Sequence, residues 1–149
     1  MYLNLVLIIL TILFSSCSPK SQFGSHFQGV KGKVIYYKGN FMPGSASGKM
    51  TPVSRKVIVF KPILSTNYSP KDGVFFDGIK EAKVAESMSD ENGNFTIGLP
   101  PGKYSILVEE EGKGLYGNSF DGQGMLTIFE IFPNQVTDYN IKLTHEAAF

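Results

Sequence analysis

The stretch SDENGNFTIGLPPGKYSILVEEEG, residues 89–112, decides the fold. Apolar side chains alternate with polar or small ones from Phe95 to Leu99, and Tyr104, Ile106 and Val108 take alternate positions in the next stretch. This period of two is typical of strands that bury one face. The pattern therefore predicts strands over residues 94–99 and 103–109, joined through two prolines and a glycine.

Turn residues stand at both ends of the first of these strands. In Asp90–Gly93 the glycine suits a left-handed conformation, and the aspartate can accept from the backbone two residues on. Pro101 and Gly102 suit the second and third positions of a type II turn. The acidic and amide residues at 90–94 could also be read as a cation loop, but the helices and the acidic twelfth ligand of an EF-hand are missing. We therefore predict a turn and no cation site here.

The remaining chain is also patterned as strands and turns. It has 149 residues, 16 of them glycine and 8 proline, which suits one all-β domain. Loops are expected over residues 39–54 and 110–124, and the segment 63–80 is left undecided. Further strands are predicted over residues 29–38, 55–61, 82–89, 125–132 and 137–144. Seven strands predict a Greek-key β-sandwich over residues 29–145, followed by a tail over 146–149.

The opening stretch resembles the signature of carboxypeptidase regulatory-like domains, also called transthyretin-like or prealbumin-like. That signature joins a D-x-x-G turn, a strand with an aromatic residue, a P-x-G-x-Y corner and a second strand. The resemblance extends over about residues 30–143, interrupted by an insert at 45–54. The matching positions are Asp90, Gly93, Phe95, Pro101, Gly102 and Tyr104.

Two further segments resemble a smaller group of proteins within this family. GLYGNSFDGQG (residues 114–124) and HEAAF (residues 145–149) are similar to uncharacterised lipid-anchored members from the Bacteroidota. The resemblance implies a seven-stranded transthyretin-like sandwich. It also implies a non-enzymatic role, as an accessory module beside peptidases, receptors or glycan-handling proteins.

The N-terminus has the pattern of a lipoprotein signal peptide. Residues 1–16 carry no charge and are almost continuously apolar from Leu3 to Phe14, too short a run to span a bilayer well. Cys17, the only cysteine in the chain, follows at once and is the predicted site of lipid attachment. Residues 17–28 then form a tether, and Ser18 favours an outer-membrane address. An ordinary cleaved signal and an uncleaved anchor are the alternatives.

The sequence offers no convincing catalytic set. The two histidines, His26 and His145, lie outside the predicted strands and are expected to be solvated rather than to hold a metal. No G-x-S-x-G motif is present, and Ser45 and Ser47 have no base nearby in the sequence. With a net charge of +1 and no basic cluster, a nucleic-acid partner is not expected. We predict no enzyme activity, no metal and no cofactor.

The long loop over residues 109–124 is the candidate ligand-binding segment. It carries Tyr116, Asn118, Phe120 and Asp121, and aromatic rings beside amides and carboxylates suit sugars or peptides. The simpler interpretation is that Tyr116 and Phe120 pack back onto the sandwich.

Two functions follow from these observations. The first is a lipid-anchored accessory or structural module of the cell envelope that contacts a protein partner by a sheet edge or a loop. The alternative is a carbohydrate- or small-ligand-binding module that uses the 109–124 loop.

Lipid attachment at Cys17 can be tested by metabolic labelling. The wild-type protein should incorporate labelled palmitate, and Cys17→Ala should not, because the thiol is the proposed acceptor. Label retained in Cys17→Ala, or absent from the wild type, contradicts the lipoprotein prediction.

Overall fold

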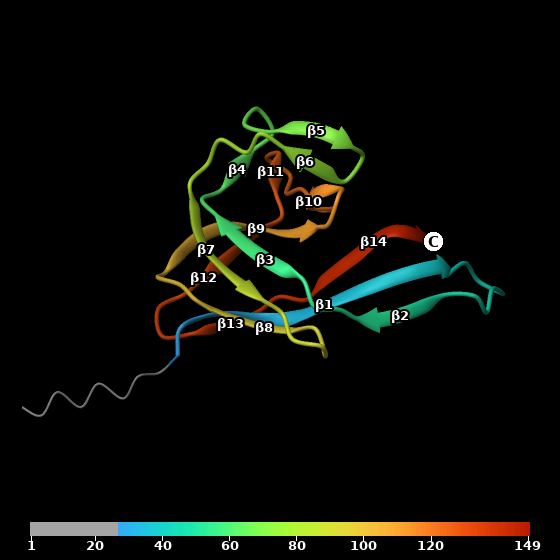
Figure 1. Ribbon diagram of the computed structural model, residues 1–149. Helices are drawn as coiled ribbons and strands as arrows, with labels where there is room; N and C mark the ends of the chain where they lie inside the picture. The colour runs from blue at the N-terminus through green and yellow to red at the C-terminus, as the bar shows by residue number, and fades with distance from the viewer. Residues whose placement is uncertain (1–26) are drawn as a thin grey trace, which may run out of the picture.

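The computed structural model describes residues 27–149, which form an all-β, sandwich-like protein of fourteen strand segments in three sheets (Figure 1). The first sheet, the β1 sheet, contains β1 (Gly29–Asn40), β2 (Lys49–Pro52), β8 (Asn94–Gly98), β13 (Val136–Asp138) and β14 (Ile141–Ala148). The second, the β9 sheet, contains β3 (Lys56–Phe60), β5 (Ser69–Asp72), β6 (Phe75–Asp77), β7 (Lys83–Met88), β9 (Gly102–Glu110), β10 (Gly114–Tyr116) and β12 (Ile128–Ile131). Finally, β4 (Ile63–Leu64) pairs with β11 (Met125–Leu126).

Strand β1 is the centre of the first sheet and changes partners halfway along its length. Its first half pairs with β8 (antiparallel) and with β13 (parallel). Its second half pairs with β2 (antiparallel) and with β14 (parallel). The second half of β1, with β2 and β14, forms an arm that projects from the body and ends near the C-terminus (Figure 1).

Two glycines make room where β1 changes partners. Gly93, at the end of the Asp90 turn, has a φ of 76°, and a Cβ there would lie 2.4 Å from the carbonyl oxygen of Val34. Its own carbonyl accepts from the Val34 amide at 2.9 Å. On the opposite edge, a Cβ on Gly32 would lie 1.9 Å from the carbonyl oxygen of Tyr139. Only a residue without a side chain fits at either position.

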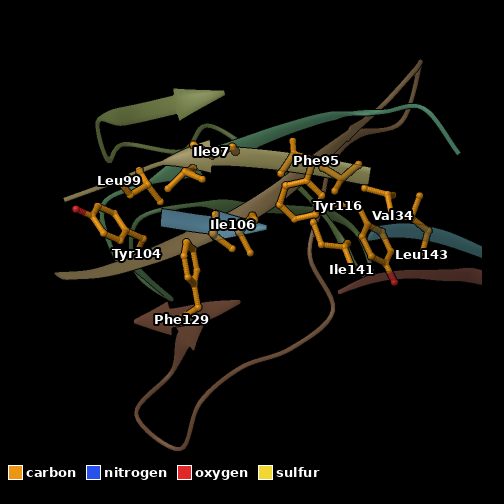
Figure 2. Close-up of a cluster of buried hydrophobic side chains, with 14 of the residues drawn as sticks. Val34, Phe95, Ile97, Leu99, Tyr104, Ile106, Tyr116, Phe129, Ile141 and Leu143 are labelled. Carbon is orange, nitrogen blue, oxygen red and sulfur yellow. The ribbon is translucent and has the colours of Figure 1, made fainter. Parts of the chain in front are cut away.

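The main core lies between the β1 sheet and the β9 sheet. Figure 2 shows its side chains meeting from both, with Val34, Phe95 and Ile141 from one sheet and Ile106 and Phe129 from the other. Alternate residues of each strand point inward, as the period of two predicts.

A second apolar cluster covers the outer face of the β9 sheet. Ile58 of β3 and Leu107 of β9 meet Phe76, while Ile63 and Leu126 of the small β4–β11 pair lie over them. Strands β3 and β9 are therefore buried on both faces, which explains why KVIVF and YSILV are continuous apolar runs with little alternation.

Five predicted strands are confirmed as β1, β3, β7, β8 and β9, with ends within two residues of the expected bounds. The last two predicted strands are each divided, into β11 with β12 and into β13 with β14. The predicted loops contain β2 and β10, and the undecided segment contains β4, β5 and β6. Strand β14 continues through Ala148, so the expected tail at 146–149 is largely strand.

Of the two predicted turns, the one at Asp90 is present and the one at Pro101 is not formed as expected. Asp90 accepts from the amides of Asn92 and Asn94 at 2.9 and 2.8 Å, as the turn prediction requires. The type II turn is not formed as expected. Gly102 has a φ of 149°, more extended than the roughly +80° of that turn, and it begins β9. The corner is closed instead by the hydroxyl of Tyr104, which donates to the carbonyl of Pro100 at 3.0 Å.

The signal segment at 1–16, Cys17 and most of the tether at 17–28 lie outside the described residues.

Matched glycine variants test the contact between the Asp90 turn and β1. Gly93 and Gly124 have similar φ values, 76° and 81°, but a Cβ on Gly124 meets nothing closer than Ser65 Oγ at 3.4 Å. Gly124→Ala should lower the free energy of unfolding by about 1–2 kcal/mol, the cost of left-handed backbone. Gly93→Ala should cost at least about 1 kcal/mol more, because β1 must also move. Urea unfolding measures both, and equal losses would contradict the close approach.

Candidate functional site

Two of the predicted ligand contacts, Tyr116 and Asn118, hold strand β14 in place. The Tyr116 side chain is 1% exposed, and its hydroxyl contacts the carbonyl of Lys142 at 3.1 Å and accepts from the Thr144 amide at 2.9 Å. Asn118 Nδ2 donates to the Lys142 carbonyl and to Thr144 Oγ1, both at 3.3 Å. The Tyr116 ring is thus part of the core, visible in Figure 2 beside Leu143, and offers no surface to a sugar.

The other two predicted contacts, Phe120 and Asp121, lie nearer the surface. Asp121 Oδ1 accepts from the amides of Gln123 and Met125 at 2.9 and 2.8 Å, which repeats the hydrogen bonds of the Asp90 turn. Phe120 is 53% exposed, with its ring centroid 6.2 Å from that of Phe76. The structure does not bring the four residues together into one binding surface.

A buried charged cluster, which sequence reasoning missed, lies where β14 crosses the β9 sheet. The carboxylate of Glu110 is 7% exposed and accepts from Arg55 Nε at 2.6 Å. Its other oxygen is 4.0 Å from Nε2 of His145, whose side chain is 6% exposed. Among residues 27–149, neither ring nitrogen of His145 has a hydrogen-bond partner.

The expectation that His145 is solvated is therefore wrong. The residue lies within β14, and three rings cover it, those of Tyr36, Phe75 and Tyr116, at centroid distances of 5.1–5.5 Å. The sequence signal was available in part, because Leu143 and His145 share one face of a strand that only appeared to end at Thr144. His26 lies outside the described residues.

Burial also sets the protonation of this region. Desolvation lowers the pKa of His145 below its ordinary value of 6.5, and Lys113 lowers it further, while Glu110 opposes the shift. Hydrogen bonds from Tyr36, Lys113 and Lys38 lower the pKa of Glu146 to about 2. His145 is thus neutral near pH 7, and its 4.0 Å approach to Glu110 is not an ion pair at that pH.

The cluster does not have the geometry of a catalytic centre. A nucleophile–base pair needs a hydroxyl or thiol within hydrogen-bond reach of the imidazole, and none contacts His145 in the part of the chain that is described. Among residues 27–149 no three His, Cys, Asp or Glu side chains are placed to hold a metal. The adjoining surface hollow of about 810 Å³ is lined by Arg55, Lys56, Glu109 and Glu110, whose charges are paired with one another.

A second feature is the end of the arm, where three exposed apolar side chains lie with two half-buried aromatic rings. We call Tyr37, Phe41, Met42, Met50 and Phe149 the arm tip. The rings of Phe41 and Phe149 stack at 5.4 Å and 17°, and the Phe41 amide donates to the Ala148 carbonyl at 2.8 Å. Met50 lies opposite Tyr37 in the β1–β2 pair. Such a cluster of exposed aromatic and methionine side chains is typical of a surface that binds a partner.

Comparison with known proteins found no relative of this chain. No protein-family model, curated protein sequence or solved structure matches the chain. Within residues 27–149 there is no helix long and apolar enough to cross a bilayer. The class of the protein is therefore defined by its strands alone, as an all-β, sandwich-like protein.

The neutral, buried His145 makes stability depend on pH. Its folded-state pKa lies below the unfolded value of about 6.5, so the unfolded chain binds the proton first and stability falls as the pH falls through 6.5. The free energy of unfolding should fall by at most about 1.4 kcal/mol per pH unit. Urea unfolding at pH 7 and pH 5 should show this loss in the wild type and a smaller one in His145→Phe.

Measurement between pH 7 and pH 5 separates the effect of His145 from that of Glu146. The stability that Glu146 contributes is lost only as the pH falls from about 4.5 to about 2. If the stability of the wild type and of His145→Phe depended on pH in the same way, the loss of stability would not come from His145.

Proposed function

We propose that this protein is a lipid-anchored, non-enzymatic module of the cell envelope that binds a protein partner through the arm tip. In this proposal Cys17 carries the lipid, the address is the outer membrane, and the body is a Greek-key sandwich of the transthyretin-like kind. The all-β arrangement, the Asp90–Tyr104 signature and the lipoprotein-like N-terminus support these parts.

The observation that carries the proposal is the position of the arm tip. Strand β1 has twelve residues, which extend about 40 Å at 3.3 Å per residue. It begins at Gly29, beside the proposed tether, and ends at Asn40, at the arm tip. An anchored molecule built in this way presents its exposed rings far from the point where its chain approaches the membrane.

The chemistry of the arm tip suits a protein surface. Aromatic and methionine side chains are enriched in protein interfaces, where they fill pockets of the partner. Two backbone edges end beside these side chains, those of β2 and β14, and each strand pairs on one side only with β1. A partner could therefore add a strand to the arm and bury the rings at the same time.

Affinity purification from membranes of the native host tests this function. The wild-type chain should retain a stoichiometric protein partner, and the double variant Phe41→Ser, Phe149→Ser should lose it, because the stacked rings are removed. Met88→Ser is the control, since Met88 on β7 lies outside the arm tip and is 62% exposed, close to the 67% of Phe149. A partner retained by the double variant, or no stoichiometric partner in the wild type, rejects the proposal.

A further inference from the structure

The opposite end of β1 also presents apolar side chains to solvent. Phe27, Phe132 and Val136 are exposed, and we call this surface the tether pole. It is assembled from distant parts of the chain. Gly29 pairs with Val136, and the Gly29 amide donates to the carbonyl of Gln135 at 3.2 Å. Phe132 begins the turn that leads into β13, with its carbonyl accepting from the Gln135 amide at 3.2 Å.

The side chain of Gln28 fixes the place where the described chain begins. Its Nε2 donates to the carbonyl of Leu99 at 2.8 Å, and its Oε1 accepts from the amide of Asn134 at 2.8 Å. One side chain therefore joins the start of β1 to the β8–β9 corner and to the β12–β13 turn, which lie together at this end in Figure 1. Phe27 is the preceding residue, and its ring lies against Gly98 at the end of β8, where a Cβ on that glycine would be 3.8 Å from the ring.

We propose that the tether pole rests on the bilayer that holds the lipid anchor, with Phe27, Phe132 and Val136 in the interfacial layer. This inference rests on the lipid anchor of the proposed function. Phe27 is the tenth residue after Cys17, so a fully extended chain between them spans at most about 35 Å. The tether pole is therefore the part of the body nearest to the lipid along the chain.

The lipid anchor also explains how an apolar surface of only three side chains can contact the membrane. Three partly exposed side chains are too few to hold a free protein on a membrane. Tethering raises their effective concentration at the membrane to the millimolar range, so a weak contact becomes populated. The rest of the molecule gains a defined orientation, with the arm tip directed away from the bilayer.

The charges near the tether pole favour apolar contact over electrostatic attraction. Lys31 pairs with Asp138 at 3.6 Å, and Lys103 lies opposite Glu130 in the β9–β12 pair. Each of these two pairs is neutral overall, so neither attracts anionic lipid. The contact is therefore expected on neutral lipid and is expected to be insensitive to salt.

The absence of tryptophan from the sequence makes a direct test possible. Phe132→Trp and Phe149→Trp each introduce a single tryptophan, at the tether pole and at the arm tip. The lipidated, full-length variants are placed in phosphatidylcholine vesicles that contain doxyl-labelled phosphatidylcholine. The fluorescence of Phe132→Trp should be blue-shifted and quenched at least about twofold more than that of Phe149→Trp, because only the first side chain reaches the interface.

Two controls complete the test. Adding Phe27→Ser to Phe132→Trp should reduce the quenching, whereas raising the salt from about 0.01 M to 1 M should leave it unchanged. Equal quenching of the two tryptophans in protein that carries the palmitate label overturns this inference alone. Loss of the palmitate label overturns the anchor and this inference together.

Discussion

The structure depends on one strand having four partners. Strand β1 binds β8 and β13 along its first half, then β2 and β14 along its second, so most of the backbone pairing in its sheet passes through it. The change of partners requires two other chain segments to approach β1 closely. Gly93 and Gly32 permit that approach, because a Cβ at either position would overlap a carbonyl oxygen. Gly93 is thus needed for long-range packing as well as for its turn.

The charge pattern of the chain follows the same connections. Residues 27–71 contain eight Lys and Arg and no Asp or Glu, and the acidic residues follow later in the sequence. Folding brings the two kinds together in pairs that join β1 to β13 and β14, and the start of β3 to β9. These pairs are Lys31–Asp138, Lys38–Glu146, Arg55–Glu110 and Lys56–Glu109. Exposed pairs stabilise little, but Glu110 is buried, so loss of Arg55 alone would leave an uncompensated charge.

The sequence predicted the strands whose apolar pattern is local. It did not predict the strands and the buried side chains that depend on tertiary contacts. Strands with alternating or continuous apolar residues were located well, whereas β2 was missed because its four residues are exposed and it exists only by pairing with β1. The Asp121 turn was missed although it repeats the Asp90 turn, because the loop around it was judged by its aromatic residues. Burial of Tyr116 and His145 depends on β14 crossing β10, a contact between segments that the sequence pattern does not connect.

This dependence also explains why residues chosen as ligand contacts from the sequence, such as Tyr116, have a structural role. The 109–124 loop has the composition of a binding loop, yet its polar groups hold β14 to the β9 sheet. Six of the nine large exposed apolar side chains in residues 27–149 lie near the two ends of β1, and the segments that carry them are far apart in the sequence. The six are Phe27, Phe132 and Val136 at one end and Met42, Met50 and Phe149 at the other. At one end Gln28 joins the start of β1 to Asn134, in the turn after Phe132, and at the other Phe41 stacks on Phe149. A long central strand separates two such surfaces by its own length, which is a geometry suited to a molecule held at one end and bound at the other.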